Sequence, residues 1–261
     1  MALVPNHAKE KLEAGGIAFC FGLRVGRTVN AGMIAKTCGF DWLFIDMEHG
    51  TFDVDLACQI SSTSLGTGVT PIVRIPGHQH FHIARVLDGG AQCVIAPHVD
   101  TVEQAEAIVR AAKYPPVGKR SMSNNLPQFG MSRMPGGDLA EQLNDNTLVI
   151  VMLETPEAIK NADAIAAVDG VDILMIGTND LCAEMGIPGQ FDHERTNVAY
   201  QAMITACEKY GKYAAMGGIY DHDLMEKYTK MGVRFMLGGA DLGFIMGAAT
   251  ARAKFLRTLV D

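Results

Sequence analysis

The sequence lacks several features that would assign it to a specialised class of protein. No two of its six cysteines lie within four residues of each other, which excludes a Cys-X-X-Cys zinc or redox motif. No run of 18 apolar residues is present, so we expect no membrane span. The first 16 residues are polar and charged, unlike a secretory signal. We therefore expect free thiols in a reducing compartment, and a cytoplasmic protein without a membrane partner.

Positive charge is also in short supply. The chain has 22 Lys and Arg against 29 Asp and Glu, a net charge of -7 at pH 7. An acidic chain has little attraction for phosphates, so we expect no nucleic-acid partner. No linker, charge block or low-complexity stretch marks a boundary, and we expect residues 1–261 to form a single domain. With 48% hydrophobic residues, a chain of this length can bury a large core without disulfides.

What recurs along the chain is a short apolar run, a polar or glycine turn, and a helix-like segment. The runs are rich in Val, Ile, Phe and Leu and hardly alternate with polar residues, which is typical of strands covered on both faces. We predict eight strands, namely Ile17–Phe21, Trp42–Asp46, Thr70–Ile75, Cys93–Ala96, Leu148–Glu154, Val171–Ile176, Tyr213–Met216 and Arg234–Leu237.

Helical segments fill most of the intervals between these runs. We predict helices at Val54–Leu65, Phe81–Leu87, Val102–Ala112, Asn197–Lys209 and Leu224–Met231, and a final helix from about Asp241 to Leu259. Strands alternating with helices in this way predict an α/β fold, a (β/α)8 TIM barrel with an extra C-terminal helix. An open doubly wound sheet is the alternative. The interval Tyr114–Asp145 has little periodicity and is interpreted as a long functional or mobile loop.

Ionisable residues lie at the ends of several predicted strands. Asp46 and His49 belong to the second strand end, Arg74 to the third, Glu154 to the fifth and Asp180 to the sixth. The carboxyl ends of barrel strands face one mouth, so we expect these side chains to share a site. Burying so many ionisable groups is costly unless they pair or bind a metal, which favours a functional site.

The residue types in this set favour metal-assisted chemistry. Glu154 and Asp180 are hard oxygen donors on adjacent predicted strands, and they suit Mg²⁺ or Mn²⁺, with Co²⁺ or Zn²⁺ as further candidates. His49 is the natural general base near neutral pH, and Asp46 or Glu48 is expected to orient its ring or to hold a bridging water.

Two further groups are expected to hold the substrate. Arg74 offers a permanently charged fork for a carboxylate or enolate oxygen. The peptide N–H groups near Asn179 and Asp180 are candidates to receive a carboxylate. A metal, a base and an arginine suit proton removal beside a carbonyl, or cleavage of a 4-hydroxy-2-oxo acid. No lysine falls within the eight runs, which argues against an imine-forming aldolase.

Five motifs follow one another in order, at residues 39–49, 71–74, 87–91, 114–120 and 239–243. Together they resemble the HpcH/HpaI family of class II pyruvate aldolases, and the resemblance runs from about residue 22 to the last helix. It implies a barrel, a divalent metal, and a homohexamer built as a trimer of dimers in which the last helix is exchanged between subunits.

The resemblance also implies a role for each site residue. By motif, His49 resembles the catalytic base and Arg74 the arginine that binds pyruvate and stabilises its enolate. Glu154 and Asp180 resemble the two metal ligands. Asp46 resembles the partner of the base. A further residue, Asp88, resembles an acid that is contributed to the neighbouring subunit's site.

One position departs from the family pattern. Many members have glutamine two residues before the metal-binding glutamate, near the pyruvate, whereas this chain has Met152. The favoured function is a metal-dependent lyase that cleaves or forms 4-hydroxy-2-oxo acids, giving pyruvate or a related 2-oxo acid and an aldehyde through a metal-bound enolate. Because of Met152, a metal-dependent hydrolase or lactonase acting on a 2-oxo acid is the alternative. A non-catalytic barrel would be favoured by loss of His49, Arg74, Glu154 or Asp180, and all four are present.

Overall fold

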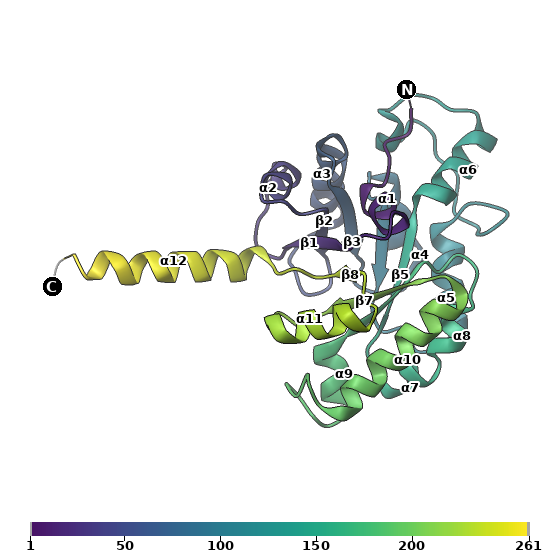
Figure 1. Cartoon of the computed structure of the whole chain (residues 1–261). Helices are drawn as coiled ribbons and strands as arrows, with labels where there is room; N and C mark the ends of the chain where they lie inside the picture. Colours follow the sequence, from purple (N-terminus) through teal and green to yellow (C-terminus); the bar gives the residue numbers. More distant parts are fainter. Residues whose placement is uncertain (1, 260–261) are drawn as a thin grey trace.

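The structure, a computed structural model that describes residues 2–259, is a closed barrel of eight parallel strands in chain order (Figure 1). This confirms the predicted (β/α)8 barrel. The strands are β1 Ala18–Leu23, β2 Trp42–Asp46, β3 Thr70–Arg74, β4 Cys93–Ala96, β5 Leu148–Leu153, β6 Ile173–Gly177, β7 Tyr213–Gly217 and β8 Phe235–Met236. The short β8 closes the barrel by pairing with both β7 and β1.

Twelve α-helices are found in the described residues. They are α1 His7–Glu13, α2 Ala31–Thr37, α3 Val54–Ser64, α4 His80–Asp88, α5 Val102–Ala112, α6 Gly136–Asn146, α7 Pro156–Lys160, α8 Ala162–Ala166, α9 Thr178–Glu184, α10 Glu194–Tyr210, α11 His222–Met231 and α12 Asp241–Arg257, with 3-10 turns η1 Leu65–Thr67 and η2 Pro127–Phe129. The bounds of β2, β4 and α5 are those predicted from the sequence.

One interval differs from the sequence interpretation. The segment Tyr114–Asp145, interpreted as a long loop, contains η2 and most of α6. Two glycines open α6, and they weaken the helical signal because glycine has a low helix propensity. The helix nevertheless buries Leu139, Ala140 and Leu143, which lie on one face at helical spacing. Packing of that face therefore outweighs the poor local propensity.

The core consists of two apolar layers, one on each face of the strands. Inside the barrel, Trp42 stacks on Phe235 with ring centroids 4.2 Å apart, and helix α1 adds Ala8 and Leu12 to the same cluster. The other layer lies between the strands and the surrounding helices. Most residues on both faces of the strands are thus buried, with Phe19 of β1 as an exposed exception, which explains why the runs hardly alternate. With α1 at the amino end of the barrel, the carboxyl end is left for a site.

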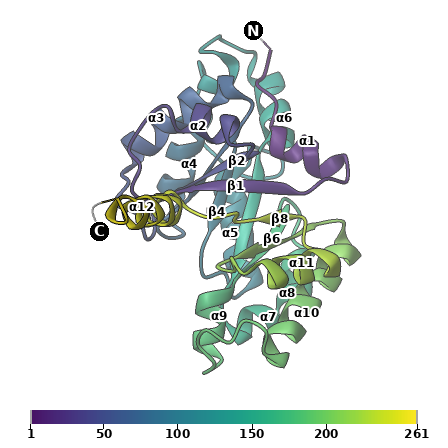
Figure 2. The ribbon, with the colours of Figure 1, turned by 60° about the vertical axis from the view of Figure 1, so that its left-hand side comes forward.

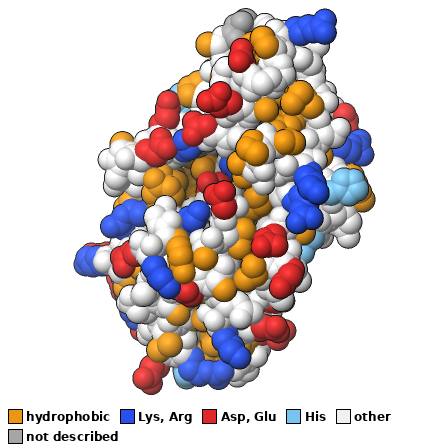
Figure 3. Space-filling model, turned by 90° about the vertical axis from the view of Figure 1, so that its right-hand side faces the viewer, with side chains coloured by type: hydrophobic (Ala, Val, Ile, Leu, Met, Phe, Trp, Pro, Cys, Tyr) orange, Lys and Arg blue, Asp and Glu red, His pale blue; other side chains and the backbone are white. Residues whose placement is uncertain are grey.

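Helix α12 differs from the others in having almost no partner. It extends away from the barrel in Figure 1, and Figure 2 looks nearly along it. Only Asp241 is buried within it, whereas Phe244, Ile245 and Met246 are among its exposed apolar side chains. The face turned away from α12 carries positive and negative side chains interspersed (Figure 3). No helix in the described part of the chain is both long and apolar enough to cross a membrane.

Candidate active site

The carboxyl ends of the strands surround a cavity of about 200 Å³. Its lining includes seven of the residues expected from the sequence to form the site: Asp46, His49, Arg74, Met152, Glu154, Asn179 and Asp180. The volume is below the roughly 300–1,000 Å³ that is typical of sites for drug-sized ligands. The cavity therefore suits a small substrate.

Asp46 and Arg74 form a buried ion pair at one side of the cavity. The parallel register of β2 and β3 pairs these two residues directly. Arg74 donates through Nε to Asp46 Oδ1 at 2.9 Å and through Nη2 to Oδ2 at 2.7 Å. Burial alone would raise the pKa of Asp46, but the Arg74 guanidinium prevails and the pKa of this carboxyl is lowered. The pair is therefore charged, and both groups have fixed orientations.

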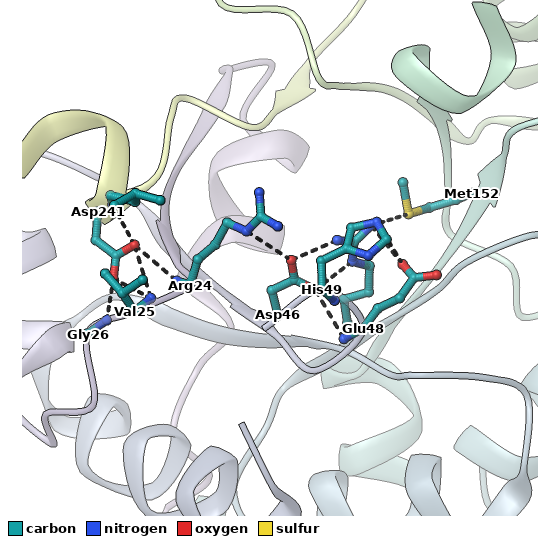
Figure 4. Close-up of polar contacts among 10 residues, drawn as sticks. Arg24, Val25, Gly26, Asp46, Glu48, His49, Met152 and Asp241 are labelled. Carbon is teal, nitrogen blue, oxygen red and sulfur yellow. Dashed lines mark hydrogen bonds and ion pairs between the residues drawn. The ribbon is translucent and has the colours of Figure 1, made fainter. Parts of the chain in front are cut away.

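His49 and Glu48 lie beside this pair (Figure 4). Arg74 Nη1 is 2.9 Å from Glu48 Oε2, an ion pair that lacks hydrogen-bond alignment. The ring of His49 is half exposed, and its Nε2 lies 4.0 Å from Glu48 Oε2. Asp46 instead accepts the backbone N–H of His49 at 3.2 Å. The structure thus directs the Asp46 carboxylate to Arg74 and to the backbone, and leaves the His49 ring free to reach a substrate.

Glu154 lies across the cavity and is in a different electrostatic situation. It is 1% exposed and has no Lys or Arg partner among the described residues. Burial, opposed by the His98 N–H and helped by the nearby Asp180 and Glu48, raises its pKa to about 7. A buried carboxylate that is surrounded by other carboxylates is unfavourable unless a cation joins it.

His98 connects the two sides of the site. From the sequence it was considered as a lining residue after the fourth strand, but it was not among the assigned site residues. Its backbone N–H donates to Glu154 Oε2 at 2.7 Å. Its ring lies 3.4 Å from Glu154 through Nδ1 and 3.4 Å from Glu48 through Nε2. The residue has φ of 50°, a left-handed conformation that is uncommon outside glycine. Its place just after β4, at the same end of the barrel, was the one available signal.

The carboxylates of this side fit a divalent cation. Glu154 requires space that a side chain at residue 177 would fill, since a Cβ on Gly177 would lie 2.3 Å from Glu154 Oε1. No three His, Cys, Asp or Glu side chains among residues 2–259 are grouped so as to hold a metal by themselves. Two carboxylates, with the other positions left to water and substrate, match the way Mg²⁺ is usually held in enzymes.

Met152 and Asn179 complete the expected substrate contacts. Met152 points into the barrel, and its Sδ is 4.0 Å from Arg74 Nη1, so the thioether occupies a place where a polar group would contact the arginine. Asn179 lies against Gly218, where an added Cβ would come within 2.6 Å of Asn179 Nδ2. Both side chains therefore limit the shape of the cavity.

A further arginine lines the cavity and was missed in the sequence. Arg24 follows β1, and its Nε is 3.8 Å from Asp46 Oδ2. The carboxylate of Asp241, the first residue of α12, accepts the backbone N–H groups of Arg24 at 3.0 Å, Val25 at 3.1 Å and Gly26 at 2.6 Å. No acid or histidine stands beside Arg24 in the sequence to draw attention to it.

Glu48 does not line this cavity but contacts Arg74, which does, whereas Asp88 lies away from the cavity altogether. It ends α4, forms an ion pair with Arg120, and lines a separate surface groove together with residues of α3 and of the segment before η2. Within one chain, Asp88 therefore takes no part in the site.

The chain is similar to known proteins along most of its length. The profile of the HpcH/HpaI aldolase/citrate lyase family matches residues 27–248. The chain is similar to a 4-hydroxy-4-methyl-2-oxoglutarate aldolase of Hapsidospora irregularis, with 37% identity over 91% of this chain and 89% of the relative. It is similar to a hydroxypyruvate/pyruvate aldolase of Agrobacterium fabrum, with 33% identity over 91% and 88%. A crystal structure of an HpcH/HpaI aldolase from Desulfitobacterium hafniense superposes with a TM-score of 0.88 at 27% identity, covering 96% of this chain and 95% of that one.

Proposed function

The chain belongs to the HpcH/HpaI aldolase/citrate lyase family, and we propose that it is a metal-dependent carbon–carbon lyase acting on 4-hydroxy-2-oxo acids. Cleavage of such an acid gives pyruvate, or a related 2-oxo acid, and a second carbonyl compound. The relatives named above are aldolases, which supports this reaction class. None of them is named as a hydrolase, so the hydrolase alternative has no support from the relatives.

One observation carries the proposal. Within a single small cavity, a buried carboxylate with no Lys or Arg partner among the described residues, Glu154, faces a buried arginine that is already paired, Arg74. The first needs a cation, and the second offers fixed positive charge to a developing anion. A reaction that passes through an enolate uses both groups.

Glu154 and Asp180 are the residues that would hold the metal, and Mg²⁺ or Mn²⁺ is the best fit to two oxygen donors. When bound, the metal supplies Lewis-acid polarisation of the 2-oxo group. Asn179, which precedes Asp180 at the start of α9, lines the same part of the cavity. We assign it to contact with the substrate carboxylate.

His49 and Arg74 carry the proton and charge changes of the reaction. The half-exposed ring of His49 takes the proton of the 4-hydroxyl group as the C3–C4 bond breaks and C4 becomes a carbonyl carbon. The electron pair of that bond forms an enolate, and Arg74 stabilises the negative charge on its oxygen. Asp46 holds the guanidinium of Arg74 in place through two hydrogen bonds. Protonation of C3 then gives the 2-oxo acid product.

A homohexamer built as a trimer of dimers is proposed for the assembly. The exposed apolar side chains of α12 support it, because a single helix without a partner does not bury its apolar side chains. In this assembly Asp88 would serve the neighbouring subunit's site. Truncation after Asp241 is expected to reduce the mass measured by light scattering to that of a smaller species. An unchanged mass would remove α12 from the assembly interface.

The cysteines support a cytoplasmic location. All six are free, and burial raises the pKa of the Cys20 and Cys93 thiols to about 12, which keeps them unreactive.

Pyruvate release from 4-hydroxy-2-oxo acids tests the proposed function. Release is followed with lactate dehydrogenase, first on protein stripped of metal and then with Mn²⁺ or Mg²⁺ restored. We expect release only after metal is restored, and we expect His49→Ala to lose turnover while retaining Mn²⁺ affinity. Absence of release with Mn²⁺ bound would refute the lyase.

A further inference from the structure

Arg24 is a cation of the cavity that the mechanism above does not use. Among the described lining residues, Arg24 and Arg74 are the two with permanent positive charge. Arg74 is engaged by Asp46 and Glu48, each within 3 Å. Arg24 approaches Asp46 only through Nε, at 3.8 Å, and Figure 4 shows its two terminal nitrogens turned away from that carboxylate. No described group accepts a hydrogen bond from those nitrogens. Arg24 therefore retains a charged fork for a ligand.

The loop that carries Arg24 is fixed rather than free. One carboxylate, that of Asp241, accepts three consecutive backbone N–H groups of this loop and is itself 5% exposed. The third donor is Gly26, where a Cβ would lie 2.9 Å from Asp241 Oδ2, so the close approach depends on glycine. A loop anchored in this way holds the base of the Arg24 side chain at the cavity, which lowers the cost of ordering it around a ligand.

Arg24 also lies on the side of the barrel opposite the proposed metal ligands. In a closed barrel with strands in chain order, β1 and β5 are diametrically opposed. Glu154 follows β5 and Arg24 follows β1. A substrate whose 2-oxo acid end is held at Glu154 and Asp180 would therefore extend its other end, the one released as the second carbonyl compound, across the cavity toward Arg24.

From this arrangement we infer that Arg24 binds a carboxylate on the second carbonyl compound, so that the enzyme prefers an anionic acceptor such as a short 2-oxo acid over a neutral aldehyde. The inference rests on the proposed lyase function and deepens it. The small cavity restricts the acceptor to a few carbons. Three carboxylates, Asp46, Glu154 and Asp180, line the cavity. Arg24 lessens the repulsion that they exert on an anionic acceptor.

The test compares two substrates that differ in one group. 4-Hydroxy-2-oxoglutarate has a carboxylate on C4, whereas 4-hydroxy-2-oxopentanoate has a methyl group there. We expect the wild-type protein with Mn²⁺ to have the higher kcat/KM for the dicarboxylate. In Arg24→Ala that preference should fall at least about tenfold, mainly through KM, because a charge-assisted hydrogen bond is lost. Arg24→Lys should restore part of it, since it keeps the charge without the fork.

Arg27→Ala is the matched control. Arg27 lies in the same stretch after β1, but it donates to Thr51 and does not line the cavity. Its replacement removes the same charge, and the ratio of the two kcat/KM values should stay at the wild-type value. Thermal unfolding and Mn²⁺ affinity of each variant verify that the fold and the metal site are intact.

The outcomes separate this inference from the proposed function. If Arg24→Ala lowers kcat/KM equally for both substrates, or leaves the ratio of the two values unchanged, Arg24 acts only on Asp46 or on the loop. The inference about the acceptor is then wrong, while the proposed lyase function is unaffected. If the wild type releases pyruvate from neither substrate, the lyase itself is wrong. Exchange of the pyruvate methyl protons in D₂O, which needs no acceptor, provides an independent measure of the lyase machinery.

Discussion

Asp46 and Glu154 lie at opposite sides of one cavity and are both buried carboxylates, yet their surroundings shift their pKa values in opposite directions. Each is a carboxylate, each is 1% exposed, and each stands at the carboxyl end of a barrel strand. The pKa of Asp46 is lowered, whereas that of Glu154 is raised to about 7. Burial acts on both in the same direction, so the difference comes from their neighbours.

Arg74 is the neighbour that accounts for the difference between the two pKa values. Its two hydrogen bonds to Asp46 compensate for the loss of water around that carboxylate. Around Glu154 the corresponding place holds two other acids, Asp180 and Glu48, and the half-exposed His98. The barrel thus carries a permanent cation on one side of the cavity and leaves the other side to a cation taken from solution. Four substitutions test this contrast.

Replacement of Arg74 should have the largest effect. Arg74→Ala leaves the buried Asp46 carboxylate unpaired, and we expect the free energy of unfolding in urea to fall by about 3 kcal/mol or more. Pyruvate release should also be lost. The double variant Arg74→Ala/Asp46→Asn should recover part of the stability but not the activity. Equal stability of the single variant and the wild type would show that water reaches Asp46.

Replacement of Glu154 should weaken metal binding and increase the stability of the metal-free protein. Glu154→Gln is expected to lower Mn²⁺ affinity in calorimetry by more than about 100-fold, since loss of even an outer-shell partner costs about 10- to 100-fold. A raised carboxyl pKa costs stability increasingly as the pH rises from the unfolded-state value of about 4.3 to the folded-state value of about 7, so in EDTA at pH 8 the variant should be at least about 1 kcal/mol more stable than the wild type. At pH 4 both side chains are neutral and the difference should vanish. A destabilised variant at pH 8 would contradict the raised pKa.

Replacement of Asp46 should decrease the free energy of unfolding, in contrast to replacement of Glu154. Asp46→Asn removes the charge that pairs with Arg74, and we expect a loss of about 1–2 kcal/mol at pH 7 by urea unfolding. A lowered carboxyl pKa stabilises the fold above the unfolded-state value of about 3.9 and ceases to do so as the pH falls through the folded-state pKa. The difference between wild type and variant should therefore shrink below about pH 4. A difference independent of pH would point to packing instead of charge.

Replacement of His98 should have the smallest effect. His98→Ala keeps the backbone N–H that donates to Glu154 and removes only the half-exposed ring. We expect Mn²⁺ affinity to change by less than about tenfold, because exposed ion pairs contribute about 0–1 kcal/mol. A loss of Mn²⁺ affinity as large as that of Glu154→Gln would indicate that the imidazole is a metal ligand.

The fold was predictable to the extent that burial leaves a pattern in the sequence. Strands covered on both faces appear as apolar runs, and β2 and β4 begin and end where their runs do. Helix α5 was also predicted with the bounds that it has, and Thr101 and Gln104 form a capping box at its start. Helix α6 was missed because its glycines hide the helical spacing of its buried face.

The candidate site was predictable where residue type and strand end coincide. Asp46, Arg74 and Glu154 could be assigned to one mouth, but the pairing of Asp46 with Arg74 depends on strand register, which a single sequence does not define. Arg24 was overlooked and His98 was left unassigned for a related reason. Their roles come from partners far away in the chain: Asp241 lies 217 residues from Arg24, and Glu154 lies 56 residues from His98.

The carboxylate that begins α12 joins two parts of the chain that are distant in the sequence. Asp241 is the root of the projecting helix and, at the same time, the anchor of the loop that presents Arg24. In the proposed assembly, a neighbouring subunit that docks on the helix would therefore influence the position of Arg24 as well as the contact surface itself.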